Sequence, residues 1–231
     1  MFSFKIVLKE LLCALFLTGL VACGGDNGVS QRDDSSGFDL ECPEEEACVV
    51  YSPKDNTLKD FRDNRVYPTV KIGNQIWMAE NLSYKVKSNS WCYEDKSSNC
   101  DKYGRLYTWA AAAKSCPTNW RLPSDSDWSA LIENAGGFSL GGEVLKSFTG
   151  WNENGNGLDT LGFSAMPGGN RDNMGRYHLL GFYAFFWSSE TTNSDSTQAI
   201  VYRLSNEESS VGLSRDYKES ALSVRCMKDD I

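Results

Sequence analysis

Apolar and polar residues alternate in two short runs of the chain, at residues 66–72 and 75–79. An alternation with a period of two is typical of strands that bury one face. Gly73 and Asn74 separate the two runs, and such a pair between β-rich segments is a hairpin signal. The pattern therefore predicts a β-hairpin over residues 66–79.

Trp128, Leu131 and Ile132 recur at the i, i+3 and i+4 spacing of a helix with one apolar face. Ser124 precedes this pattern as a candidate N-cap. Asp127 stands at the capping-box spacing, although aspartate replaces the usual glutamate or glutamine. Two consecutive glycines after residue 135 supply a C-terminal stop. These signals predict an amphipathic helix that begins directly after Ser124.

Two further helices are expected. Residues 108–114 are rich in alanine, the best helix former, and residues 142–147 predict a shorter helix. From residue 149 onward the pattern changes to turns and short strands. Strands are expected at residues 162–166, 176–180, 183–187, 199–204 and 221–226.

The N-terminal segment has the pattern of an export signal. Lys5 and Lys9 form a basic region before an apolar run that begins at residues 11–17 and is too short for a spanning helix. The tetrad LVAC at residues 20–23 follows and resembles the lipobox of bacterial lipoproteins. Residues 1–22 are therefore expected to be a lipoprotein signal peptide. An ordinary secretory signal with a cysteine nearby is the alternative.

By the same resemblance, Cys23 would be triacylated and would hold the protein stably on a membrane. Palmitate is one of the acyl chains expected there. Gly24 rather than aspartate follows the lipid site, which argues against retention in the inner membrane. The expected location is the bacterial cell envelope, on the outer membrane and exposed at the cell surface.

The charge of the chain is acidic and unevenly distributed. The formal net charge is −8, and residues 23–65 hold eleven acidic and five basic residues. This polar segment is expected to be a flexible tether, and residues 66–231 the folded domain. Since no basic stripe is present, nucleic acid is not an expected partner.

Six cysteines remain once Cys13 is removed with the signal and Cys23 is lipidated, and an even number in an exported protein indicates disulfides. Six cysteines allow 15 connectivities. Local closure favours two pairs of near neighbours and leaves a third pair. A zinc site is disfavoured because no C-x-x-C spacing occurs and His178 is the only histidine. The expected pairs are Cys42–Cys48, Cys92–Cys100 and Cys116–Cys226.

Six motifs occur in order over residues 66–228. They are VKIGNQIWMAENL at 70–82, YGRLYTW at 103–109, CPTNWRLPSDSDW at 116–128, GFSAMPGG at 162–169, FWSS at 186–189 and SVRC at 223–226. Together they resemble the Fibrobacter succinogenes major paralogous domain family. That resemblance implies an exported or lipid-anchored bacterial surface domain of unknown molecular function.

Residues 120–128 also resemble the start of the corresponding helix in formylglycine-generating enzymes, which share the C-type-lectin-like fold. The expected fold class is therefore α+β: a disulfide-stapled, C-type-lectin-like domain with two main helices and short antiparallel sheets. A disulfide from the first helix to the last strand is typical of that fold. Cys116 and Cys226 stand where it would fall.

An enzyme related to the formylglycine-generating group is one functional hypothesis. Such chemistry needs a reactive cysteine pair near the C-terminal end, and Cys226 is alone in that region. The sequence therefore favours a protein that is not an enzyme.

Oxygen-bearing side chains recur in the loop that follows Trp151. Asn152, Asn154, Asn156 and Asp159 alternate in a way that resembles half of a calcium-binding loop. The twelfth position holds Phe163 instead of a bidentate glutamate, so a plain turn-rich loop is favoured over a calcium site. No other cofactor is expected.

Trp91 and Trp151 fall in loops and are the candidate surface aromatics, with the loop of Asn152, Asn154, Asn156 and Asp159 beside the latter. The expected function is non-catalytic binding of an extracellular glycan or another envelope protein. The alternatives are the enzyme hypothesis above and a structural envelope protein without a specific ligand.

Overall fold

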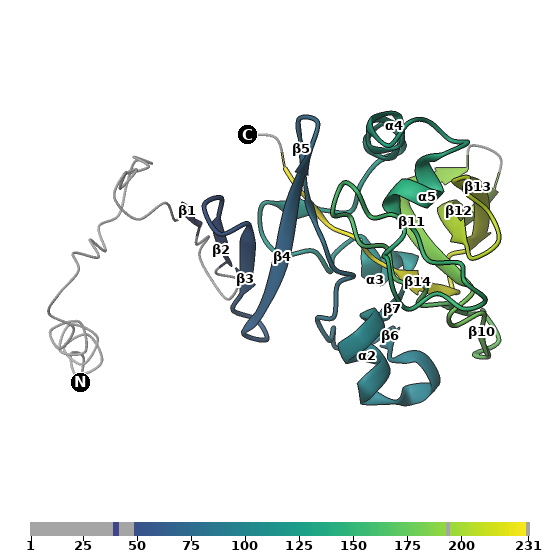
Figure 1. Cartoon of the computed structure of the whole chain (residues 1–231). Helices are drawn as coiled ribbons and strands as arrows, with labels where there is room; N and C mark the ends of the chain where they lie inside the picture. The colour runs from purple at the N-terminus through teal and green to yellow at the C-terminus, as the bar shows by residue number, and fades with distance from the viewer. Residues whose placement is uncertain (1–38, 42–48, 193–194, 230–231) are drawn as a thin grey trace, which may run out of the picture. The chain divides into compact units, whose positions relative to one another are not determined.

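The computed structural model describes residues 39–41, 49–192 and 195–229 (Figure 1). The predicted signal peptide, the predicted lipidation site Cys23 and the predicted Cys42–Cys48 pair lie outside the described residues. No helix in the described ranges has the length and apolar character that crossing a membrane requires.

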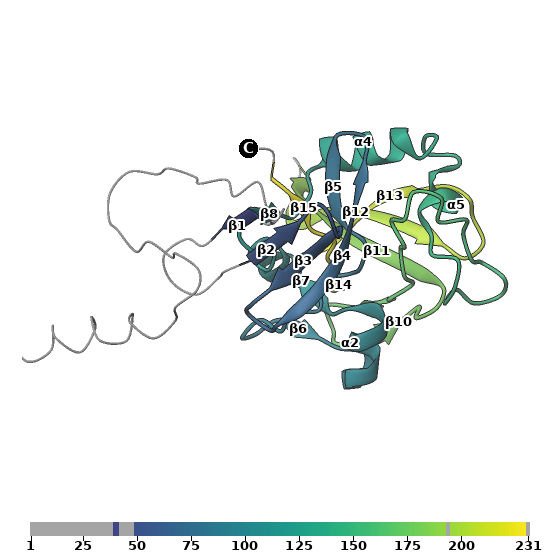
Figure 2. The same cartoon turned by 60° about the vertical axis from the view of Figure 1, so that its left-hand side comes forward.

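The first sheet has seven strands in the order β1-β2-β3-β4-β5-β15-β8. All its neighbours are antiparallel, and its first five strands follow one another along the chain (Figure 2). The last strand, β15, is inserted between β5 and β8. The strands are β1 (Asp39–Glu41), β2 (Val49–Ser52), β3 (Thr57–Asp60), β4 (Arg65–Ile72), β5 (Gln75–Met78), β8 (Trp120–Arg121) and β15 (Met227–Lys228).

The predicted hairpin is confirmed as β4 and β5, with Ile72 paired to Gln75 across the turn. Gly73 in that turn has a φ of 59°, the left-handed region in which glycine has no steric penalty. The ordered sheet begins earlier than residue 66, the start expected from the sequence. Residues 49–60 form β2 and β3, and Leu58 is fully buried in the core.

The second sheet has eight strands. Its main path runs β10-β9-β14-β11-β12-β13, and β7 pairs with both β14 and β6. Among the named strands of the described residues, β11 and β14 form the one parallel pair. The strands are β6 (Ser90–Trp91), β7 (Leu106–Thr108), β9 (Asn170–Arg171), β10 (Tyr177–His178), β11 (Tyr183–Thr192), β12 (Asp195–Ser205), β13 (Gly212–Tyr217) and β14 (Ala221–Ser223).

Helices are few and short in the described ranges. They are the 3₁₀ helix η1 (Tyr93–Asp95) and the α-helices α2 (Ser97–Tyr103), α3 (Trp109–Ala112), α4 (Asp125–Asn134) and α5 (Gly141–Leu145). The expected α+β, C-type-lectin-like fold with two main helices is therefore wrong, because the protein is mostly β-sheet and α4 alone exceeds two turns.

The alanine-rich stretch shows why the fold class was mispredicted. Residues 108–114 were expected to form a main helix, but α3 holds only four residues. A short isolated helix is marginal in water whatever its propensity, so it needs an apolar face to pack. Ala112 is buried, whereas Ala110 and Ala113 are exposed. Pro117 disfavours a helical conformation at Cys116, so a helix could not continue past that point in any case.

Helix α4 has the predicted cap. The Ser124 side chain accepts from the Asp127 backbone, and the Asp127 carboxylate accepts from the Ser124 backbone at 2.7 Å. Arg121 Nη2 also donates to Asp127 at 3.0 Å. Burial alone would raise the pKa of Asp127, but the hydrogen bonds from Arg121 and Ser124 outweigh it, so the pKa is lowered.

The apolar face of α4 packs into an aromatic cluster. Trp128 stacks on Tyr202 of β12 with ring centroids 5.0 Å apart, and lies 5.2 Å from Trp77 of β5. Phe163 and Phe186 complete the cluster with edge or tilted contacts. The two sheets are thus joined by aromatic side chains that extend from β5 to β12.

Both disulfides expected in the described part of the chain are confirmed, Cys92–Cys100 and Cys116–Cys226. The second closes a sequence separation of 110 residues and joins the segment after α3 to the residue before β15. It therefore fastens the last strand to the middle of the chain.

Removing this long bridge should destabilise the fold strongly. In the chain-entropy model a closed loop of about 100 residues contributes about 4.7 kcal/mol, against roughly 2.5 kcal/mol for one of about 8 residues. We expect Cys116→Ala/Cys226→Ala to lower the free energy of unfolding, measured by urea denaturation, more than Cys92→Ala/Cys100→Ala. An equal or smaller loss from the long-bridge variant would contradict this.

Candidate functional site

A fully buried arginine lies between the second sheet and the last strand of the first. Arg225 Nη1 donates to the carbonyl of Met78 at 3.1 Å and to that of Phe163. Its Nη2 donates to Asn81 Oδ1 at 2.7 Å and to the Ser164 carbonyl at 3.3 Å, and its Nε reaches Asn81 Oδ1 at 3.3 Å. All the hydrogen-bond acceptors of this guanidinium are neutral.

Burial without a bonded carboxylate changes the acidity of Arg225. Desolvation lowers the pKa of its guanidinium to about 9, while the charges of Glu80 and Asp159 act in the opposite direction. The group therefore remains a cation at neutral pH. The cost of burying that charge is offset by its hydrogen bonds and by a ring contact of 4.3 Å to Phe163.

Asn81 carries the network toward the surface. Its Nδ2 donates to the Tyr103 carbonyl at 2.9 Å, at the last residue of α2. The next residue, Gly104, has a φ of 75°, and a Cβ there would lie 2.7 Å from the Cβ of Asn81. Only glycine allows the two segments to approach this closely. Arg225 and Asn81 together therefore position the C-terminal end of α2.

A cleft of about 340 Å³ lies directly over this network. It is bounded by β4, the segment after β5, the end of α2 and the loops at 147–149 and 159–166. Asn81 and Ser164, which both bond to Arg225, line it. The charged lining residues are Arg65, Glu80, Asp101, Lys102 and Asp159, and the apolar and aromatic ones include Pro68, Tyr103, Phe148 and Met166.

The charged groups of the cleft differ in how far they are already paired. Arg65 lies 3.6 Å from the Glu80 carboxylate, a loose and partly exposed ion pair. Lys102 Nζ lies 4.8 Å from the centroid of the Tyr103 ring. Within the described residues, no hydrogen bond or ion pair engages the carboxylate of Asp101, which is exposed. The cleft therefore offers both donors and acceptors to a ligand.

The carboxylate of Asp159 is partly exposed, but it is held by hydrogen bonds from the protein. Both of its carboxylate oxygens accept hydrogen bonds from Ser164, one from the backbone N–H at 2.7 Å and one from the hydroxyl. Its backbone and that of Ser164 have positive φ values of 47° and 53°. Asp159 thus fixes the turn that presents the Ser164 carbonyl to Arg225.

Phe148 is the most exposed apolar residue of the cleft, with 68% of its surface accessible. The loop that carries it is anchored on both sides. Ser147 Oγ lies 2.7 Å from the carbonyl oxygen of Thr149 and 3.0 Å from that of Ala165, and its single O–H is shared between them. Trp151 Nε1 donates to Ser147 Oγ at 3.1 Å. An exposed phenyl ring on a fixed loop is a surface suited to contact with a ligand.

The structure separates the aromatic residues that the sequence analysis put forward. Trp151 is 5% exposed, so the prediction that it lies on the surface is wrong; it supports the Phe148 loop instead. Trp91 lies in β6, half-buried beneath Arg171, whose guanidinium carbon is 4.2 Å from its ring centroid. Trp91 does not line the cleft.

The polar residues of the same prediction have separate roles. Asn152 and Asn154 are exposed, and Asn156 Oδ1 accepts from the Trp151 backbone at 3.1 Å. Of the set, only Asp159 lines the cleft. Over the described ranges, no group of three or more His, Cys, Asp and Glu side chains is arranged to hold a metal ion.

Sequence reasoning missed most of the cleft. Phe148, Arg65, Glu80 and Asp101 come from four separate segments, and no local pattern relates them. One signal was available: Phe148 is a large apolar residue within a polar, turn-rich stretch. Arg225 was also visible as a charge inside an otherwise apolar strand-like run, a position that requires buried partners.

This geometry defines a disulfide-bonded, mostly β domain with a buried arginine beneath a surface cleft that has both charged and apolar lining residues. The chain matches the Fibrobacter succinogenes major domain over residues 70–228 and belongs to that family. The resemblance noted in the sequence is thereby confirmed. Searches of curated proteins and of solved structures found no match.

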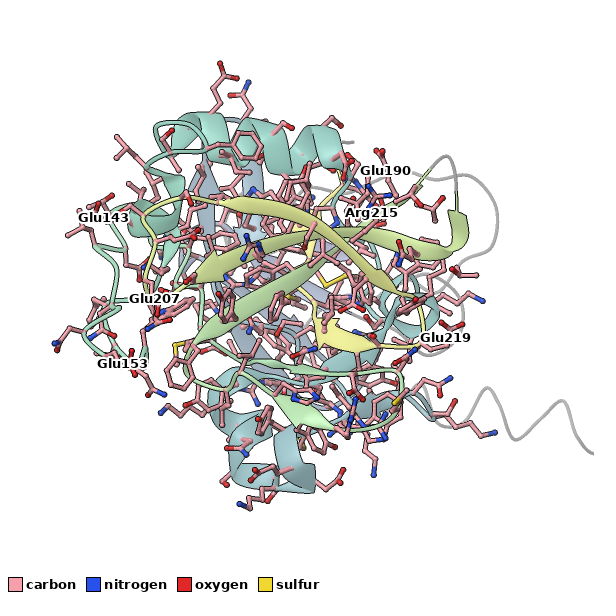
Figure 3. All side chains as sticks on the ribbon, turned by 90° about the vertical axis from the view of Figure 1, so that its right-hand side faces the viewer. Glu143, Glu153, Glu190, Glu207, Arg215 and Glu219 are labelled. Atoms are coloured by element: carbon pink, nitrogen blue, oxygen red, sulfur yellow. A yellow bond between two sulfur atoms is a disulfide. The ribbon has the colours of Figure 1, made fainter. Side chains whose placement is uncertain are left out.

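Arg225 should be essential to the stability of this domain. We expect Arg225→Leu to lower the free energy of unfolding by about 3–5 kcal/mol, because several buried carbonyl oxygens lose their donors. The measurement is urea denaturation followed by tryptophan fluorescence. Arg215→Leu is the matched control, since Arg215 is exposed on β13 (Figure 3) and its loss should cost no more than about 0.5 kcal/mol. Equal losses in the two variants would contradict the assignment.

Proposed function

We propose that this protein is a non-catalytic module, held on the outside of the bacterial envelope by a lipid at Cys23, that binds an extracellular glycan in the cleft. The observation that carries the proposal is the exposed Phe148 ring beside the charged groups of the same cleft. The lipid anchor rests on the LVAC tetrad at residues 20–23.

The chemistry of the cleft suits a sugar. A sugar ring presents an apolar face of C–H groups and a rim of hydroxyls, each of which both donates and accepts hydrogen bonds. Phe148 supplies an apolar surface for the face. Asp101 supplies an acceptor, and Lys102 supplies a donor. The cleft volume is at the lower end of the range of about 300–1,000 Å³ for ligand sites, which favours a short segment or the end of a glycan.

Two features favour binding over catalysis. Cys226 is fully buried and joined to Cys116, so it supplies no thiolate of the kind that formylglycine-generating chemistry needs. Asp159 has both carboxylate oxygens in hydrogen bonds to Ser164. Both groups thus have structural roles.

The anchor is tested by metabolic labelling with a clickable fatty acid in a bacterial host that processes lipoproteins. We expect label on the wild-type chain and none on Cys23→Ser, because the thiol of Cys23 receives the first lipid. Cys13→Ser is the matched control, since it removes a cysteine from the predicted signal peptide and should leave the label unchanged. Equal label on wild type and Cys23→Ser would refute the anchor.

Glycan binding is tested with the unlipidated full-length chain, Cys23→Ser, on a glycan array and on insoluble polysaccharides. We expect Phe148→Ala and Asp101→Asn each to weaken the affinity for the selected glycan by roughly tenfold, equivalent to about 1.4 kcal/mol. Phe138→Ala is the control, because Phe138 is 45% exposed and does not line the cleft.

Unchanged affinity in Phe148→Ala and Asp101→Asn would place glycan binding elsewhere on the protein. If no glycan binds and one purified envelope protein captures the chain, the partner is a protein and not a glycan. Release of new reducing ends from a bound glycan would overturn the non-catalytic assignment.

A further inference from the structure

The Cys92–Cys100 disulfide has a cation placed against both of its sulfurs. Arg105 Nη1 lies 3.3 Å from the Sγ of Cys92 and 3.3 Å from the Sγ of Cys100. The rest of the guanidinium is held by Ser90, with Nε donating to Oγ at 3.1 Å and Nη2 to the carbonyl at 2.9 Å. The arginine is therefore fixed in position by four contacts.

No carboxylate neutralises this cation in the described part of the chain, and the nearby acidic residues have other partners. Glu94 pairs with Lys96 at 2.7 Å, and Asp95 accepts from the hydroxyl of Tyr177 at 2.9 Å. A thiolate on either sulfur would become the first anionic partner of Arg105. A neighbouring guanidinium stabilises a thiolate, lowers its pKa and makes it a better leaving group.

The position of Arg105 is set by the fold. It stands directly before β7, and β7 pairs with β6 so that Leu106 lies opposite Trp91. Its backbone N–H donates to the Leu82 carbonyl at 2.9 Å. These contacts do not involve the disulfide, so the cation should stay in place when the S–S bond is broken.

The other described disulfide has no cation against its sulfurs. Cys226 is fully buried in the core, and within the described residues no donor reaches either sulfur of Cys116–Cys226. Cys92 is partly exposed, whereas Cys100 is 6% exposed. Cys116 is also partly exposed, so an external thiol can reach one sulfur of either bridge. The contact with Arg105 is what distinguishes the short bridge from the long one.

We propose that Cys92–Cys100 is a thiol–disulfide exchange site for an external dithiol, with Arg105 as the residue that stabilises the leaving thiolate. A thiolate of the dithiol attacks Cys92 Sγ, the S–S bond breaks, and Cys100 leaves as a thiolate beside Arg105. The second thiol of the dithiol then attacks the mixed disulfide and releases Cys92. Two electrons and two protons pass from the dithiol to the two cysteines, and the dithiol becomes a disulfide.

The proposal does not depend on glycan binding. It is tested on the folded, unlipidated full-length chain with limiting dithiothreitol, alkylation of the free thiols at timed intervals and peptide mapping by mass spectrometry. We expect Cys92 and Cys100 to be alkylated well before Cys116 and Cys226, with the tryptophan fluorescence of the folded protein unchanged. Opening of both bridges together, only as the fluorescence changes, would overturn the proposal.

Arg105 is tested by the rate of the same reaction. We expect Arg105→Gln to slow reduction of Cys92–Cys100 by at least about threefold, since the leaving thiolate loses its cation. The rate of reduction in Arg105→Lys, which keeps the charge, should fall between those of the wild type and Arg105→Gln. Arg215→Gln removes the same charge from the edge strand β13 and should react at the wild-type rate.

An unchanged rate in Arg105→Gln, or one equal to that of Arg215→Gln, would remove Arg105 from the proposal. Should Arg105→Gln fail to fold, as judged by its fluorescence, the comparison of Arg105→Lys with the wild type decides. A wild-type rate of reduction in Arg105→Lys would then argue that the contact of the guanidinium with both sulfurs does not stabilise the leaving thiolate.

Discussion

The guanidinium of Arg225 is the interaction on which the rest of the structure depends. Its five N–H groups bond to acceptors on Met78, Asn81, Phe163 and Ser164, so one side chain joins the end of β5, the 163–164 segment and the approach to β15. Many strands of this domain, such as β6, β8 and β15, have only two residues, and they make few repetitive contacts. A buried cation with a fixed fork of donors specifies the positions of three segments at once. The surface cleft is a consequence, because Asn81 and Ser164 reach from this network to its lining.

Local sequence signals correctly predicted those elements that depend on residues close together in the chain. The hairpin turn at Gly73 and the capping box between Ser124 and Asp127 depend on residues a few positions apart, and both were predicted. The short disulfide followed from loop closure, and the long one from elimination and from the resemblance to the C-type-lectin-like fold.

The fold class and most of the site could not be obtained in this way. Strands such as β6, β8 and β15 hold two residues each, too few to show any periodicity. The alanine-rich run has helical propensity, but it offers little apolar surface that could be buried against the rest of the protein. Trp151 was predicted to lie on the surface because it falls in a loop. Its indole N–H instead donates to Ser147 and Ala165, and no local pattern reveals these contacts. The cleft combines segments separated by up to about a hundred residues, so its composition is decided by tertiary structure.

The place of β15 in the first sheet has a consequence for the order of assembly. Met227 pairs with Trp77 on one side and with Arg121 on the other, so the final strand fills the gap between β5 and β8. A ribosome or an export channel delivers the N-terminal strands first, and this gap stays open until residue 228 arrives. Pairing between ends so distant in sequence is slow to form and leaves strand edges unpaired in the meantime. A chain truncated before Arg225 would therefore lack this arginine, the Cys116–Cys226 disulfide and one inner strand of the sheet. It would expose the unpaired edges of β5 and β8.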